Sequence, residues 1–434
     1  MKPFYLAVAA MMCAGASWSA RAQEQDAAAC PEMLPAETRC YSGQVASGAF
    51  YWIAIPREWN RTLVVHAHGG PRGEPDPEET REDLERFAVT VREGYAWIAS
   101  TYRRGGYGVR MAAEDTEAMR ALFWQRFGRP DRTLVHGQSW GGNVAAKLAE
   151  LYAIDASGAQ VYDGVILTSG LIAGGTRAYD FRADLRAVYQ YYCGNHPRPE
   201  ETQYPVWQGL PAGQAMKRSE LEARVDECTG LDTPAEQRSD TQKRNLANIL
   251  GVIPIEEDSL VSHLSWATNT FADLVNDRLD GRNPFSTEDV RYTGSDDDDA
   301  LNAGVARFAA DPWAVARLAY DSDMSGLIVL PTLTLHALHD PTVFASQERV
   351  YHDVVAHAGR SDLLVQTFTD ETTHSKLSTP QYAALFAAMD AWLDRDEKPD
   401  RLSVEQLCQD VYAKRYDEPC RFTPAEPDPP PPAR

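Results

Sequence analysis

The sequence predicts an α/β fold: a mostly parallel, twisted sheet with helices on both faces, and a mainly helical cap inserted after the sixth strand. Three observations predict it. Short β-rich runs alternate with helical patterns. That alternation stops for about 155 residues and then resumes, too long a break for a loop in a compact domain. Finally, 434 residues with 44% hydrophobic and 10% aromatic content can bury a large core.

The first part of the chain supplies the beginning of the sheet. Its β-rich runs are residues 50–55, 62–66, 95–100, 133–136 and 164–168. Its helical patterns are residues 80–92, 112–127 and 143–152. Because strands and helices alternate along this part, we expect crossover connections between parallel strands.

The second part of the chain completes the sheet after the predicted cap. We expect the first part of the core at residues 23–170, the cap at 171–325 and the second part of the core at 326–395. The later elements are a strand at 327–336, a helix at 346–358, a strand at 363–369 and a helix at 380–393. Residues 396–434 form a tail whose proline-rich end is expected to be disordered or extended.

Residues 1–22 have the features of a secretory signal peptide. Lys2 precedes an apolar stretch at 4–16, which is too short for a comfortable membrane span. Ala20 and Ala22 frame a small-x-small cleavage site. The alternative is a buried N-terminal helix. We therefore expect an exported protein, periplasmic or extracellular. Its net charge of -21 argues against nucleic acid or an anionic membrane surface as the main partner.

Cysteine usage agrees with export. Six cysteines follow the predicted signal, and six allow 15 connectivities. They fall into three local couples, so the expected disulfides are Cys30–Cys40, Cys193–Cys228 and Cys408–Cys420. Buried free thiols are the alternative. No cysteine or histidine cluster has zinc spacing.

The strongest motif is G-x-S-x-G, at Gly137, Ser139 and Gly141, between a β-rich run and a helix. In that context the glycines permit a strained turn from strand to helix. The turn lifts the Ser139 hydroxyl to the edge of the sheet, beside the free amides of the helix N-terminus. A serine hydroxyl is a poor nucleophile, so it needs a base, and the base needs an orienting acid.

With these residues the chain resembles the α/β-hydrolase family over about residues 44–393, apart from the cap. Asp340 follows a later strand, where the family places its acid, and His374 lies between the last strand and the last helix, where the family places its base. The order Ser139, Asp340, His374 is the family's order. The segment 68–71 (HGGP) matches the oxyanion loop.

The resemblance implies a role for each residue. Ser139 attacks a carbonyl carbon, His374 moves the proton, and Asp340 orients the imidazole. The backbone N–H groups of Trp140 and Gly70 are the expected oxyanion donors. Asp370 is the rival acid, and Asp340 is alternatively a helix N-cap.

Candidate residues for substrate binding are Arg103, Arg104, Tyr107 and Trp266. The arginines are suited to an anionic group on a substrate, although such residues more often pair with acids to hold a loop. Aromatic residues of the cap are expected to line an apolar pocket, or else to form the cap's own core. We expect no metal site and no cofactor, because His66 and His68 lack further ligands and the acidic run 296–299 lacks the remaining residues of a calcium loop.

The leading prediction is an exported serine hydrolase that cleaves a carboxylic ester through an acyl-enzyme. A first alternative keeps the fold and cleaves short peptides, because residues 69–71 and 139–141 are similar to motifs of prolyl aminopeptidase-type serine peptidases. Here Arg72 and Gln138 depart from that pattern. A second alternative is a non-catalytic scaffold that binds a ligand. The sequence predicts no oligomeric state.

Overall fold

The computed structural model describes residues 26–428. The predicted signal peptide and residues 429–434 lie outside this range. The described residues form a ten-stranded sheet. Its strands are β1 (Ala27–Ala28), β2 (Arg39–Gln44), β3 (Phe50–Ile55), β4 (Thr62–Ala67), β5 (Ala96–Ser100), β6 (Arg132–Gln138), β7 (Gly164–Thr168), β8 (Thr332–Ala337), β9 (Leu364–Thr369) and β10 (Phe422–Thr423).

The strands lie in the order β1-β2-β3-β5-β4-β6-β7-β8-β9-β10. From β5 through β9 all neighbours are parallel, whereas β1, β2, β3 and β10 pair antiparallel at the two sides. The exchange of β4 and β5 and the parallel run that follows are the α/β-hydrolase topology, so the predicted fold class is confirmed. Every residue of β4, β7, β8 and β9 is buried, as expected for parallel strands covered on both faces.

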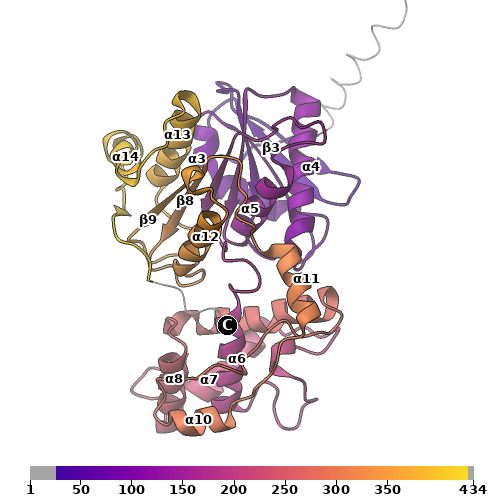
Figure 1. Cartoon of the computed structure of the whole chain (residues 1–434), viewed down its shortest axis with the longest axis vertical. Helices are drawn as coiled ribbons and strands as arrows, with labels where there is room; N and C mark the ends of the chain where they lie inside the picture. The colour runs from indigo at the N-terminus through magenta and orange to yellow at the C-terminus, as the bar shows by residue number, and fades with distance from the viewer. Residues whose placement is uncertain (1–25, 429–434) are drawn as a thin grey trace, which may run out of the picture.

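Helices cover both faces of the sheet (Figure 1). One face carries α4 (Val109–Phe127), α5 (Trp140–Tyr152) and α12 (Ser346–His357), whose apolar residues share one core cluster. The other face carries α2 (Pro77–Arg86), α3 (Ala88–Arg92) and α13 (Thr379–Arg395), whose apolar residues share a second cluster. Among the described residues, no helix combines the length and apolar character needed to cross a membrane.

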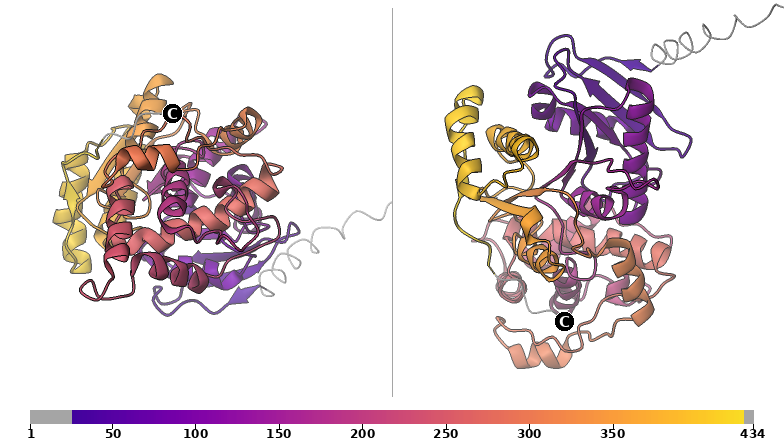
Figure 2. Two further views of the ribbon diagram at one scale, coloured as in Figure 1. Left: turned by 90° about the horizontal axis from the view of Figure 1, so that it is seen from below. Right: turned by 45° about the horizontal axis from the view of Figure 1, so that its top comes forward.

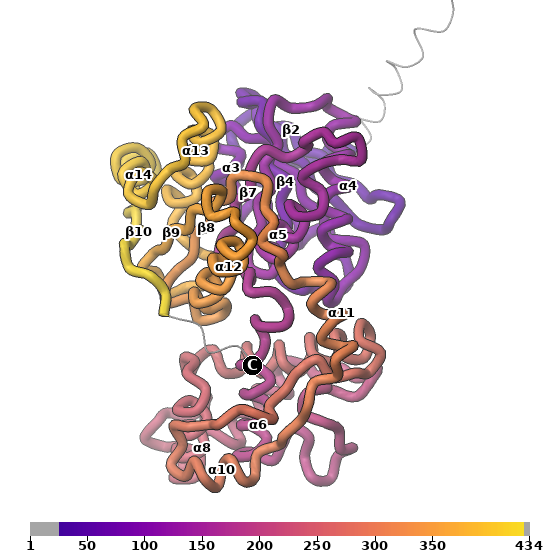
Figure 3. The backbone as a smooth tube through the Cα atoms, in the orientation of Figure 1, coloured from indigo at the N-terminus to yellow at the C-terminus, as the bar shows by residue number. Residues whose placement is uncertain are grey.

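A mainly helical segment, here named the helical insertion, separates β7 from β8. Its helices are α6 (Asp180–Cys193), η1 (Val206–Gln208), α7 (Arg218–Thr229), α8 (Asp240–Val252), η2 (Glu257–Ser259), α9 (Leu260–Ser265), η3 (Trp266–Thr270), η4 (Asp273–Arg278), α10 (Asp298–Gly304) and α11 (Pro312–Ser322). The chain leaves the sheet after β7 and returns through α11 (Figure 3). Figure 2 shows the insertion lying against one end of the sheet. The sequence places it after the sixth strand, but it follows β7, the seventh described strand; β1 and β2 were not among the five β-rich runs identified before it.

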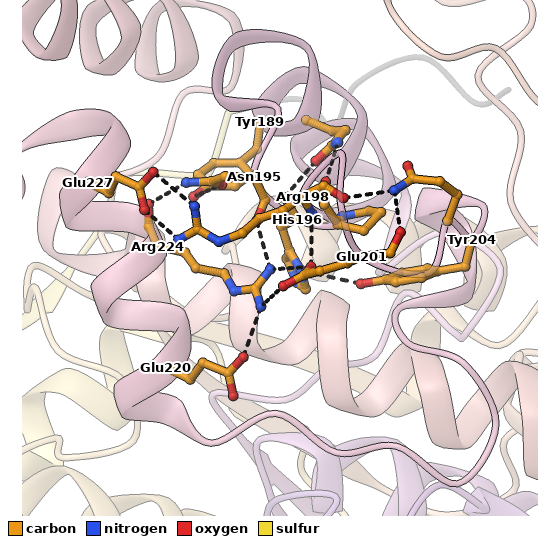
Figure 4. A network of polar contacts seen from close by, with 12 residues as sticks. Tyr189, Asn195, His196, Arg198, Glu201, Tyr204, Glu220, Arg224 and Glu227 are labelled. Atoms are coloured by element: carbon orange, nitrogen blue, oxygen red, sulfur yellow. Dashed lines mark hydrogen bonds and ion pairs between the residues drawn. The ribbon is translucent and has the colours of Figure 1, made fainter.

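The helical insertion has its own core and its own polar network. Apolar residues of α6, α7, α8 and α9 form a third cluster. Beside it, the Arg224 guanidinium binds the Glu201 carboxylate at 2.7 and 2.8 Å, and it also binds Glu220 at 2.9 Å (Figure 4). The disulfide Cys193–Cys228 joins the end of α6 to α7. These interactions lie within the insertion, so its packing does not depend on the sheet alone.

The tail folds back onto the core. It forms α14 (Arg401–Leu407), η6 (Cys408–Tyr412) and α15 (Ala413–Tyr416), and then β10 pairs with β9. The disulfides Cys30–Cys40 and Cys408–Cys420 are present, so the structure has all three expected pairings. The expectation of a disordered or extended end concerns residues 424–434. Of these, the structure describes 424–428, and Pro427 is buried.

Two predicted elements differ from the structure because of local backbone constraints. The run 327–336 was expected to be one strand, but the strand begins at Thr332, directly after Pro331. Proline has no N–H to donate to a neighbouring strand. The helical pattern 80–92 is divided at Phe87, whose φ of -106° and ψ of 28° lie outside the helical region.

Candidate active site

Ser139 lies on a tight turn between β6 and α5. Its φ of 58° and ψ of -128° are rare for a residue with a side chain. Glycine is required on both sides of it. A Cβ at Gly137 would overlap the carbonyl of Gly141, and a Cβ at Gly141 would overlap the carbonyls of Ala67 and His68. The geometry is therefore the strained strand-to-helix turn that the G-x-S-x-G motif predicts.

Ser139, His374 and Asp340 are joined by two hydrogen bonds. The Nε2 atom of His374 lies 2.8 Å from Oγ of Ser139. The Nδ1 atom of the same ring lies 2.7 Å from Oδ2 of Asp340. The three residues are up to 235 positions apart in sequence, and the ends of β6, β8 and β9 bring them together. These partners assign the tautomer of His374. Its Nδ1–H donates to the Asp340 carboxylate, and Nε2 accepts from the Ser139 hydroxyl.

Each oxygen of the Asp340 carboxylate has a separate function. Oδ1 accepts from the backbone N–H groups of Thr342 and Val343, at 2.8 and 2.9 Å. Oδ2 faces His374, and the side chain has no exposed surface. The rival acid, Asp370, instead forms an exposed ion pair with Arg421 at 2.8 Å. The capping geometry expected as an alternative for Asp340 therefore coexists with its contact to His374.

A second buried acid and histidine lie behind Asp340. Nε2 of His336 is 3.6 Å from Oδ2 of Asp340 and 2.8 Å from the Val343 carbonyl, and Nδ1 is 3.2 Å from Glu348. Burial disfavours the charged imidazole, but the hydrogen bond and charge of Glu348 outweigh it and raise the pKa of His336. Glu348 was not predicted as a site residue, because it lies inside a helical pattern, where a glutamate normally faces solvent.

The loop expected to hold the oxyanion passes directly beside Ser139. A Cβ built on Gly69 would lie 3.2 Å from Cβ of Ser139. Trp140 begins α5, so its N–H is one of the first helix amides, which lack an intrahelical acceptor. The ring of His68 stacks on Tyr102 with centroids 4.0 Å apart, and burial lowers its pKa to about 4. A neutral, stacked His68 supports the loop rather than adding a charge to the site.

Ser375 offers a second hydroxyl to the same imidazole. Its Oγ lies 3.2 Å from Nε2 of His374, and it accepts a hydrogen bond from the Gln138 side chain. Neither Ser375 nor Gln138 was predicted from the sequence as a site residue. A serine next to the histidine was visible in the sequence, but no pattern indicated that its side chain turns back onto the ring.

The structure places the four candidate residues for substrate binding in different surroundings. Arg103 binds Asp115 and Glu114, at 2.7 and 2.9 Å. Arg104 donates to the carbonyls of Gly105 and Tyr107. Tyr107 is buried, with its ring centroid 5.8 Å from that of Trp140. Trp266 is partly buried and packs on Tyr179 at 4.3 Å.

The strand histidines lie in the core. Nδ1 of His66 is 3.0 Å from Nδ1 of His136, and burial lowers the pKa of His136 to about 3. Within residues 26–428, no three histidine, cysteine or acidic side chains are grouped so that they could hold a metal ion.

A cavity of about 920 Å³ borders Asp340 and lies between α6, the end of α8 and the start of α12.

No protein-family model and no curated protein matches the chain. Solved structures of several esterases are similar to it. The rice cell wall degrading esterase LipA from Xanthomonas oryzae is 13% identical, with 83% of this chain and 90% of that chain covered and a TM-score of 0.39. Feruloyl esterase B from Aspergillus oryzae is 14% identical, with 84% of this chain and 81% of that chain covered and a TM-score of 0.44. A highly thermostable carboxyl esterase from Bacillus coagulans is 14% identical, with 76% of this chain and 89% of that chain covered and a TM-score of 0.36. At such identities and scores, the likeness assigns no residue and no substrate to this chain.

Proposed function

We propose that the protein is an exported serine hydrolase that cleaves carboxylic esters through an acyl-enzyme intermediate. The observation that supports this most strongly is the continuous hydrogen-bonded chain from Ser139 through His374 to Asp340, with Ser139 on a strained turn. Holding a hydroxyl, an imidazole and a buried carboxylate in this order is what makes a serine nucleophilic.

In the proposed acylation step, Oγ of Ser139 attacks the ester carbonyl carbon while Nε2 of His374 takes its proton. The Asp340 carboxylate stabilises the imidazolium that forms. The N–H groups of Trp140 and Gly70 bind the developing oxyanion, and one such donor is typically worth about 2.7–4 kcal/mol. His374 then gives its proton to the leaving alcohol, which departs and leaves Ser139 acylated.

In deacylation the same groups act on water. His374 takes a proton from a water molecule, whose oxygen attacks the acyl carbon. Collapse of the second tetrahedral intermediate returns the proton to Oγ of Ser139 and releases the carboxylic acid. The proposed domain division follows from this site: the sheet carries the reacting groups, and the helical insertion acts as a cap that contributes side chains around them.

The test compares the two serines that contact His374. We expect a fluorophosphonate probe to label Ser139, as read from the labelled peptide by mass spectrometry. Ser139→Ala is expected to abolish labelling and to lower kcat for 4-nitrophenyl butyrate by roughly a million-fold. The matched variant Ser375→Ala should keep both the label and most of the turnover. A protein that is never labelled would support the binding scaffold, and a label on Ser375 would overturn the assignment of the nucleophile. If the protein is labelled, aminoacyl anilides tested beside the ester separate peptidase from esterase.

A further inference from the structure

Arg182, in the first turn of α6, is a buried cation with no carboxylate partner among the described residues. Only 2% of the residue is exposed. Its Nη2 donates to the carbonyl oxygen of Thr342 at 3.1 Å. Its Nε and Nη1 atoms are also buried, and within residues 26–428 they have no hydrogen-bond partner. The guanidinium thus keeps unused N–H donors inside the protein.

The position of Arg182 ties it to the proposed reaction centre. The residue that takes its one hydrogen bond, Thr342, itself donates to Oδ1 of Asp340 at 2.8 Å. The negative charge of Asp340 also raises the pKa of the Arg182 guanidinium, against the larger lowering by burial. That acid, however, already binds His374 and two backbone amides. Arg182 therefore lies beside the triad without being neutralised by it.

Aromatic rings continue from Arg182 to the residue after the nucleophile. The guanidinium carbon lies 4.7 Å from the ring centroid of Trp266. Trp266 packs on Tyr179 at 4.3 Å, Tyr179 on Tyr107 at 6.0 Å, and Tyr107 on Trp140 at 5.8 Å. The unused donors are thus at one end of a series of packed aromatic rings whose other end is the ring of Trp140, the residue whose backbone N–H is a proposed oxyanion donor.

Two other arginines are paired with acids, whereas Arg186, one turn further along α6, is also buried without a carboxylate partner among the described residues and donates to the His196 carbonyl at 3.1 Å. Arg224, in the same insertion, is held by Glu201 and Glu220, and Arg72 in the core binds Asp83. A buried ion without a partner is destabilising, and a hydrophobic side chain of similar size is often better for stability. Contact with Trp266 compensates only in part. Burial lowers the pKa of Arg182 to about 10, so it still carries its charge at neutral pH.

We propose that Arg182 binds a carboxylate group of the substrate, and that the preferred substrates are esters that carry a free carboxylate. This inference rests on the proposed function and adds the substrate class to it. The unused N–H groups of Nε and Nη1 are charge-bearing donors of the kind that bind carboxylate oxygens. The guanidinium carbon lies 4.6 Å from the ring centroid of Phe181. Phe181 also lines the cavity of about 920 Å³ that borders Asp340, so this ring separates Arg182 from the space beside the proposed triad. Trp266 begins a π-helical turn, a feature frequent at functional sites.

The test uses substrate pairs that differ only in charge. With the charge on the acyl side, mono-4-nitrophenyl esters of glutaric, adipic and pimelic acid are compared with their methyl-blocked counterparts. With the charge on the alcohol side, 4-butyryloxybenzoate is compared with its methyl ester. We expect the parent enzyme to prefer the charged member of at least one pair by about 10- to 100-fold in kcat/KM, and the pair that shows this places the carboxylate.

Arg182→Met removes the charge and keeps the bulk of the side chain. Its expected effect is loss of that preference through a higher KM for the charged ester, with kcat/KM for the neutral ester within about threefold of the parent. Arg182→Lys should keep part of the preference, and Arg317→Met, which removes an exposed arginine of α11, should keep all of it.

Two results would overturn the inference: a parent enzyme without preference in any pair, or an equal fall for charged and neutral esters in Arg182→Met, which would mean a purely structural role. If Arg182→Met does not fold, Arg182→Lys gives a weaker form of the comparison: it should lose part of the charge preference with the neutral ester unaffected, and an equal fall for both esters would again mean a purely structural role. If the parent enzyme cleaves neutral esters, requires Ser139 to do so and shows no preference for charged esters, the carboxylate site is refuted and the proposed function stands. No cleavage of any ester refutes the proposed function.

Discussion

Replacement of Asp340 by asparagine tests the division of labour between the two carboxylate oxygens. In Asp340→Asn, the amide oxygen has to take the Oδ1 position, because only an acceptor can face the N–H groups of Thr342 and Val343. The amide NH2 then occupies the Oδ2 position, 2.7 Å from Nδ1 of His374. A donor there forces the imidazole to keep its proton on Nε2, where it can no longer accept from Ser139.

The size of the effect follows from charge and tautomer together. Two opposite unit charges about 4 Å apart interact by about 4 kcal/mol at an effective dielectric constant near 20, which corresponds to roughly a thousand-fold in rate. The wrong tautomer raises the expected loss of kcat to about 10⁴-fold. The fold should persist, with the free energy of unfolding changed by less than about 1 kcal/mol, because the turn bonds of Oδ1 survive.

The assay is release of 4-nitrophenol from 4-nitrophenyl butyrate at fixed pH, beside urea unfolding of the same samples. The matched control is Asp370→Asn, which removes an exposed carboxylate paired with Arg421 and should leave kcat within about twofold. A kcat of folded Asp340→Asn within tenfold of the parent value, or a larger loss of kcat in Asp370→Asn, would refute this role of Asp340.

Two further predictions concern stability. Since the folded-state pKa of His336 is raised above 6.5, its charge stabilises the fold below pH 6.5, and that contribution is lost as pH rises above this value. Urea unfolding at pH 6 to 9 should show this decline, and Glu348→Gln should flatten it; an unchanged slope would exclude Glu348 as the cause. The disulfide between Cys193 and Cys228 closes a loop with a sequence separation of 35 residues, which corresponds to roughly 3–4 kcal/mol in the chain-entropy model. The double variant Cys193→Ala/Cys228→Ala should therefore unfold at lower urea than the parent without loss of ester turnover at low temperature, whereas an unaltered midpoint would contradict this estimate.

The sheet was predictable because its signals are local. Each parallel strand is a short apolar run, and the glycines around Ser139 specify the turn that follows β6. The order of the three polar residues along the chain was enough to nominate the site. The folded tail was not predicted, since α14 and α15 are too short to show a clear period and depend on tertiary packing.

The sequence could not predict which arginines keep unused hydrogen-bond donors. Arg103 and Arg104 stand in a glycine-rich loop and were the natural candidates for anion binding, but acids and carbonyls of the core occupy their donors. Arg182 lies in a helical pattern that also contains Asp180 and Asp184, where the sequence gives no reason to expect burial. Whether a cation keeps unused donors depends on tertiary neighbours, which no local pattern encodes.

The two outermost strands of the described sheet have a consequence for the behaviour of the protein outside an oxidising compartment. β1 and β10 are each two residues long, and each has a disulfide close by, Cys30–Cys40 and Cys408–Cys420. Exposed strand edges are templates for intermolecular pairing. These disulfides therefore hold the two edge strands in place. In a reducing cytosol, loss of the disulfides would expose the sheet edges and favour aggregation.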